Sequence, residues 1–155
     1  MSYLRNSCYL PYCIEVEEVH SNRYGKRGYK RAPRKEPTRE EIAEANERRR
    51  IKKLYRIIAT NFDFGDYHAV LTYRMDERPT PEQAKKILRT LLRNLRKAYQ
   101  KRGEPLHYII VTEYERAAIH HHLIINEIGD TIKILKRLWP YGGTHFTPIY
   151  EAGEV

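Results

Sequence analysis

Apolar and polar residues alternate regularly from about Tyr67 to the end of the chain. Four segments there have the short alternation and the β-branched or aromatic residues that favour strands. Two segments repeat apolar residues every three or four positions, which is the period of a helix with one buried face. The predicted strands cover residues 68–74, 106–114, 119–126 and 144–150, and the predicted helices cover residues 81–102 and 129–138.

Both predicted helices have clear boundaries. Thr80 can cap the first helix, Pro81 suits its first turn, and Gly103 follows its last apolar residue. The second helix stops at Pro140. The order strand, helix, strand, strand, helix, strand is that of two split βαβ units. We therefore predict an α+β fold with a ferredoxin-like βαββαβ core, an antiparallel sheet that carries its helices on one face.

The residues before Tyr67 follow a different pattern. Residues 13–17 alternate and predict one short strand, whereas residues 21–35 are rich in Lys and Arg without any acidic residue, which is typical of a flexible basic arm. A helix is predicted from Thr38 to about Ala59, with an apolar stripe on one side and a cationic surface on the other. We expect residues 1–36 to form an N-terminal segment with the arm, and residues 37–155 to form a core domain led by this helix.

The charge of the chain favours a polyanionic partner. Its 155 residues include 29 Lys and Arg against 20 Asp and Glu, a formal net charge of +9. Nucleic acid is the first candidate, although a soluble basic protein without such a partner has the same composition. The candidate DNA contacts are Arg23, Lys26, Arg27, Lys30 and Arg31 in the arm, Arg49, Lys52 and Lys53 in the leading helix, and Thr72, Tyr73 and Arg74 at the end of the first core strand.

The N-terminal residues do not have the pattern of a signal peptide, and no apolar run is long enough to span a membrane. We therefore expect a cytoplasmic protein without a membrane partner. Cys8 and Cys13 are too few for a secreted disulfide scaffold. They could join His20 in a zinc site, but no fourth ligand is evident.

The candidate chemistry centres on three consecutive histidines, His120, His121 and His122, within an apolar strand. Successive side chains of a strand point to opposite faces of a sheet, so His120 and His122 share one face and His121 points to the other. Two imidazoles side by side on a rigid strand form half of a divalent-metal site.

An acidic partner follows from the hairpin that precedes these histidines. If Arg116 and Ala117 form a two-residue turn, Glu113 lies directly opposite His120 and projects to the same face. Glu113, His120 and His122 would then converge. Arg-Ala is not a favoured turn sequence, and one added bulge residue would change the partner, with Glu115 as the other acid on that face.

Two imidazoles and one carboxylate leave coordination positions open, as in a catalytic metal site. Without a nearby cysteine, these ligands suit Mg²⁺ or Mn²⁺, and Mn²⁺ fits mixed nitrogen and oxygen ligands better. The alternative is that His120 and His122 only line a polar sheet face. His145 is expected to be an ordinary residue of the last strand, while His68 and His107 begin strands and contact phosphate or nothing.

Several segments resemble a known family. Residues 119–124, IHHHLI, resemble the His-hydrophobic-His motif of HUH endonucleases, with His121 at the middle position that is usually apolar or aromatic. Residues 111–114, VTEY, are similar to the strand with the family's acidic ligand, and residues 70–73, VLTY, are similar to its first motif, a strand that helps to place DNA. Residues 138–142, LWPYG, also resemble rolling-circle replication initiators of the phage and plasmid Rep type.

This resemblance implies a metal-dependent endonuclease that acts on single-stranded DNA at a replication origin, with host replication proteins as further candidate partners. In the family a tyrosine attacks the phosphodiester and becomes linked to the 5′ phosphate. That tyrosine normally lies on a helix well downstream of the His motif, whereas here only Tyr141 and Tyr150 follow the motif, in a turn and at a strand end. We assign no catalytic residue, and expect a shortened chain that binds metal and single-stranded DNA but cleaves poorly or not at all.

Two other functions stay open. A non-catalytic RRM-like module has the same strand order and would stack bases on Tyr73, Tyr108 and Tyr114, although no RRM signature is present. A related transposase or relaxase would share the metal chemistry. The former normally has a longer C-terminal stretch, and the latter usually has a third metal-binding histidine.

Overall fold

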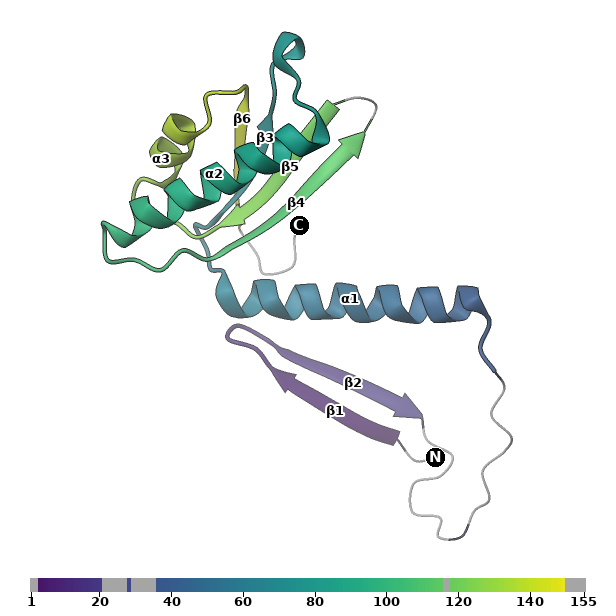
Figure 1. The fold of residues 1–155 in the computed structure, drawn as a ribbon. Helices are drawn as coiled ribbons and strands as arrows, with labels where there is room; N and C mark the ends of the chain where they lie inside the picture. Colours follow the sequence, from purple (N-terminus) through teal and green to yellow (C-terminus); the bar gives the residue numbers. More distant parts are fainter. Residues whose placement is uncertain (1–2, 21–27, 29–35, 116–117, 150–155) are drawn as a thin grey trace. The chain divides into compact units, whose positions relative to one another are not determined.

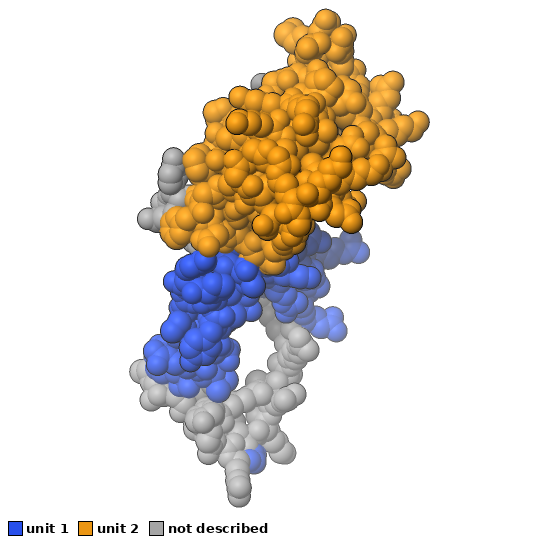
Figure 2. All heavy atoms as spheres, turned by 90° about the vertical axis from the view of Figure 1, so that its left-hand side faces the viewer, with its two compact units in different colours: residues 1–60 blue, residues 61–155 orange. Residues whose placement is uncertain are grey.

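The computed structural model describes residues 3–20, 28, 36–115 and 118–149. The chain divides into two compact units, residues 1–60 and residues 61–155, which Figure 2 shows in different colours. The described residues form three α-helices and two antiparallel sheets, which confirms the predicted α+β class. The predicted domain boundary after residue 36 concerns independent folding and stays a prediction.

The first unit contains a β-hairpin that the sequence predicts only in part. Strands β1 (Tyr3–Tyr9) and β2 (Ile14–His20) pair antiparallel along their whole length. β1 has no regular alternation of apolar and polar residues, so its strand conformation depends on the pairing with β2 rather than on a pattern of its own.

The hairpin separates the residues of the zinc site that the sequence left open. Cys8 pairs with Glu15 near the turn, and both Cys8 and Cys13 are free thiols. His20 is at the far end of β2, opposite Tyr3. At the rise of an extended strand this is roughly 17 Å from Cys8. A zinc site that combines the two cysteines with His20 is therefore wrong.

Helix α1 (Arg39–Asn61) begins where the sequence predicts. The Thr38 hydroxyl accepts a hydrogen bond from the Glu41 amide, and the Glu41 carboxylate accepts one from the Thr38 amide. This reciprocal capping satisfies two amides that a helix start would otherwise leave without partners.

The second unit is the ferredoxin-like core, and its topology is confirmed. Its elements are β3 (Tyr67–Thr72), a short 3₁₀ turn η1 (Met75–Glu77), α2 (Pro81–Gln100), β4 (Tyr108–Glu115), β5 (Ala118–Ile125), α3 (Thr131–Leu138) and β6 (Thr144–Pro148). The strands form one antiparallel sheet in the order β4-β5-β3-β6. Helices α2 and α3 cover one face of this sheet (Figure 1).

Helix α2 has the predicted start, because the Thr80 hydroxyl accepts from the Gln83 amide while the Gln83 side chain accepts from the Thr80 amide. Pro81 occupies its first turn. Among the helices of the described residues, none combines the length and the apolar composition that crossing a membrane requires.

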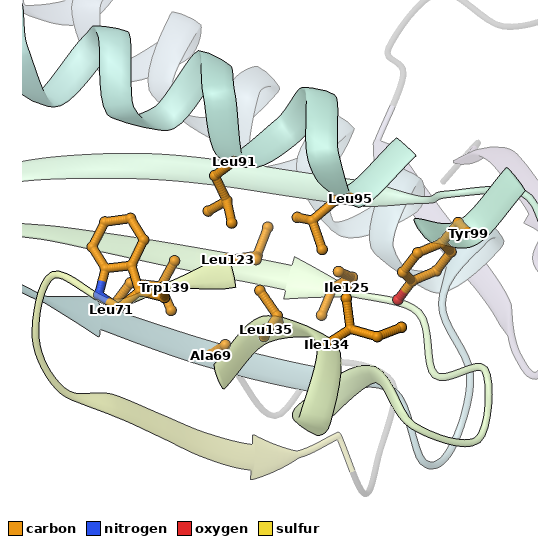
Figure 3. Packing of buried hydrophobic residues seen from close by; sticks show 10 residues of the cluster. All are labelled: Ala69, Leu71, Leu91, Leu95, Tyr99, Leu123, Ile125, Ile134, Leu135 and Trp139. Atoms are coloured by element: carbon orange, nitrogen blue, oxygen red, sulfur yellow. The ribbon is translucent and has the colours of Figure 1, made fainter. Parts of the chain in front are cut away.

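The hydrophobic core lies between the helix layer and the sheet (Figure 3). Its buried residues are Leu91, Leu95 and Tyr99 of α2, Ile134 and Leu135 of α3, Trp139, Ala69 and Leu71 of β3, and Leu123 and Ile125 of β5. Within the described part of the second unit, no helix covers the other face. We call it the open face, and its central side chains are His68, Val70, Thr72, Val111, Glu113, His120 and His122.

The segment after α3 packs against the end of β3. The indole N–H of Trp139 donates to the carbonyl oxygen of Thr72, and the amide of Thr72 donates to the carbonyl of Gly143. A Cβ atom added to Gly142 would lie 2.2 Å from the same Thr72 oxygen. Only glycine fits this close approach of two backbones.

Replacing Gly142 with Ala should lower the free energy of unfolding by about 1–3 kcal/mol, because the added methyl group collides with backbone atoms that cannot turn away. Gly143→Ala is the matched control: its Cβ would meet only the Thr72 hydroxyl, at 2.9 Å, and this side chain can rotate. Urea unfolding of both variants measures the difference. Equal losses at the two positions would contradict the assigned role of Gly142.

Candidate functional site

Strand β5 divides the three histidines between the two faces of the sheet, as the sequence predicts. His121 lies on the helix side and is fully buried. Its Nδ1 forms a hydrogen bond with the Thr112 hydroxyl and its Nε2 with the Tyr73 hydroxyl, both at 2.9 Å. Burial, with a smaller effect of His120 and His122, lowers the pKa of His121 to about 4. The ring is therefore neutral at physiological pH, and both of its nitrogens have partners.

An aromatic cluster encloses His121 on the helix side. The rings of Tyr73 and Trp139 contact the His121 ring at centroid distances of 5.6 Å, and Tyr141 packs against both. Burial, followed by the nearby Tyr141 and Tyr114, raises the pKa of the Tyr73 hydroxyl. The side chain of Tyr73, a predicted DNA contact, thus points toward the core.

The pairing of β4 with β5 brings an acid to the open face. Glu113 lies directly opposite His120, and Val111 lies opposite His122. This register is the one that a two-residue turn predicts, and it is confirmed, although turn residues 116–117 lie outside the described residues. Glu115 pairs with Ala118, and its side chain also lies outside the described part of the chain.

His122 is held from both sides on this face. Its Nε2 lies 3.1 Å from Oε2 of Glu113 on β4, and its Nδ1 lies 3.2 Å from Nε2 of His68 on β3. The His68 and His122 rings stack nearly parallel, with centroids 5.4 Å apart. Burial, followed by His122 and His145, lowers the pKa of His68. Three neighbouring strands thus contribute to one row of side chains.

His68 is the part of this row that sequence reasoning missed. The sequence places it only at the start of a strand. Its contact with His122 depends on the pairing of β3 with β5, which joins segments more than fifty positions apart. The alternation of His68 with Thr72 on one face was the available signal, but the identity of the partner strand was not.

The donor atoms on the open face are of the types that a divalent cation takes. Glu113 offers a carboxylate, and His120 and His122 offer imidazoles from the directly paired strand. The contact between Glu113 and His122 already joins two of the three. Among the described side chains, however, no three His, Cys, Asp or Glu groups are already arranged as a metal-binding cluster.

The remaining histidines of the second unit lie apart from this row. His145 on β6 is exposed and pairs with Val70 across the sheet. The His107 ring lies within 3.4 Å of the carbonyl oxygen of Asn61, before the start of β4.

The predicted DNA contacts have different surroundings. The five arm residues, Arg23, Lys26, Arg27, Lys30 and Arg31, lie outside the described residues. Lys52 on α1 is bound to Glu15 and Glu17 of β2, whereas Arg49 and Lys53 are exposed without an ion pair among the described residues. Thr72 lies on the open face opposite His120, and the exposed Arg74 approaches Glu77 at 3.6 Å.

A family model described as replication-associated protein ORF2 matches residues 66–154, which is more than half of the chain. The chain belongs to this family. Membership gives the replication-associated protein a role in DNA replication, and the match contains the whole four-stranded sheet with both helices that cover it. No curated protein and no solved structure matches the chain.

In this replication-associated protein, His121→Phe should lower the free energy of unfolding by about 1–3 kcal/mol, because the buried hydroxyls of Tyr73 and Thr112 lose their partner. Urea unfolding measures the loss. Tyr73→Phe removes one of the same hydrogen bonds, so the double variant should lose less than the sum of the two single variants. Additive losses would show that the hydrogen bond between the two side chains contributes nothing.

Proposed function

We propose that the replication-associated protein contains an HUH-type nuclease core that acts on single-stranded DNA at a rolling-circle origin. One observation carries the proposal: the β4–β5 register directs Glu113, His120 and His122 to one open face, in a chain of a replication family. In this proposal the three side chains bind one divalent cation, Mn²⁺ or Mg²⁺.

Each residue of the row then has a defined role. Glu113 and His122 supply two donors that already lie within hydrogen-bond distance, and His120 supplies the third from the position opposite Glu113. His68 holds Nδ1 of His122 and orients the ring, as the second partner of a metal-binding histidine commonly does. The buried His121 anchors the strand between its two neighbours.

The proposed reaction is a metal-assisted transesterification of a phosphodiester. A bound divalent cation supplies the positive charge that polarises a phosphoryl oxygen and stabilises the charge that develops there. The open face is accessible to a strand of DNA, since Glu113 is exposed and Val111 beside it is 57% exposed. The attacking hydroxyl is assigned to no residue. The Tyr141 ring packs against Trp139 in the aromatic cluster, and Tyr150 lies outside the described residues.

The positions of the tyrosines weigh against the RRM-like alternative. That module stacks bases on aromatic residues of the uncovered sheet face. Tyr108 packs against the core beneath α2, where Arg96 lies over its ring, and Tyr73 bonds with the buried His121. Tyr114 has the same position in the alternation of β4 as Tyr108. A transposase or relaxase would share the metal site, and membership of a replication family favours the initiator.

The variants Glu113→Gln, His120→Ala and His122→Ala should each weaken Mn²⁺ binding at least about tenfold, because each removes one of three ligands. Isothermal titration calorimetry with Mn²⁺ alone measures this without any requirement for cleavage. His107→Ala is the matched control, since His107 lies just before β4, outside the row, and should leave the affinity unchanged. Full Mn²⁺ affinity in all three variants would exclude the proposed metal site and restore the non-catalytic alternative.

A further inference from the structure

The outer face of helix α2 is strongly cationic. Its exposed basic side chains are Lys85, Lys86, Arg89, Arg93, Arg96 and Lys97. Glu82, in the first turn, is the single acidic residue of this helix. The neighbouring α3 adds the exposed Lys133, Lys136 and Arg137 and has no acidic residue. The outer surface of the helix layer is therefore positively charged along both helices.

The charges of α2 are not neutralised within the described part of the chain. On α1, by contrast, Arg48 and Arg50 pair with glutamates of their own helix, and Lys52 pairs with glutamates of β2. Among the described residues, the lysines of α2, Arg89 and Arg93 form no ion pair, and Arg96 contacts only the hydroxyl and ring of Tyr108. Several cations of α1 thus have carboxylate partners, whereas the cations of α2 have none among the described side chains.

The spacing of the α2 cations suits a linear polyanion. Lys85, Arg89, Arg93 and Lys97 follow one another at intervals of four residues, so they form one row with a rise of about 6 Å per step. Like charges at this spacing weaken an isolated helix, and a row of phosphates alongside would remove the repulsion. The row is about 18 Å long, which corresponds to about five nucleotide steps of one DNA strand.

The row lies on the opposite side of the sheet from Glu113, His120 and His122, because α2 covers the helix-side face (Figure 1). The two surfaces therefore cannot contact the same phosphate. We propose that the outer face of α2 is a second DNA-binding surface, which holds the phosphate backbone of a DNA segment outside the one at the open face. This proposal rests on the family's role in DNA replication and is independent of the metal site.

The double variant Arg89→Gln/Arg93→Gln tests this surface. Fluorescence anisotropy in EDTA, with a duplex and a single strand each several times longer than the row, measures the affinity over a range of salt concentrations. Loss of two phosphate contacts should reduce the slope of log K against log salt by about 1.8 for a duplex or about 1.4 for a single strand. At physiological salt the affinity should fall about tenfold or more. A change confined to one of the two DNAs supports the surface and identifies the form that it holds.

Two controls separate a specific surface from a general charge effect and from misfolding. Arg5→Gln/Arg48→Gln removes the same charge from residues paired with Glu18 and Glu44, and should change the slope by less than half as much. Arg89→Lys/Arg93→Lys keeps the charge and should keep the slope. An unchanged slope for both DNAs in the glutamine variant of α2 overturns the proposal and leaves an acidic protein as the occupant of this face.

Discussion

The register between β4 and β5 is the constraint on which the proposed site depends. Side chains of a strand alternate between faces, so a slip of one residue would turn His120 and His122 toward the core and His121 toward solvent. The same slip would withdraw Leu123 and Ile125 from beneath α2 and would bury imidazoles without hydrogen-bond partners. Packing of the helix layer therefore determines which donor atoms face outward, and the chemistry of the open face follows from the hydrophobic core behind it.

The buried histidine connects the two faces of the sheet. Its partners are Thr112 and Tyr73, and each of them precedes or follows an open-face residue, Glu113 and Thr72. Hydrogen bonds on the core side thus hold the backbone segments that carry the open-face side chains. On the open face, His68 and Glu113 hold the ring of His122 from two different strands. The site is rigid because both faces of β5 are bonded to both neighbouring strands.

The sequence predicted the parts of this arrangement that depend on nearby residues. Alternation along β5 separated His121 from its neighbours, and a short hairpin related Glu113 to His120 without knowledge of any other element. Contacts between distant segments could not be predicted in the same way. The stacking of His68 on His122 depends on the pairing of β3 with β5, and the pairing of Lys52 with Glu15 and Glu17 depends on a hairpin whose first strand has no pattern of its own. A count of basic residues likewise could not distinguish the cations of α1 that have carboxylate partners from those of α2 that do not.

The central claim is that Glu113, His120 and His122 surround one cation on the open face. Nuclear magnetic resonance of the full chain with ¹⁵N-labelled histidine, during addition of less than one equivalent of the paramagnetic Mn²⁺, tests it most directly. The account predicts that the imidazole signals of His120 and His122 broaden first, while the signal of His107, beyond the other end of β4, broadens last. Earlier broadening at His107, or unchanged signals from His120 and His122, would contradict the account.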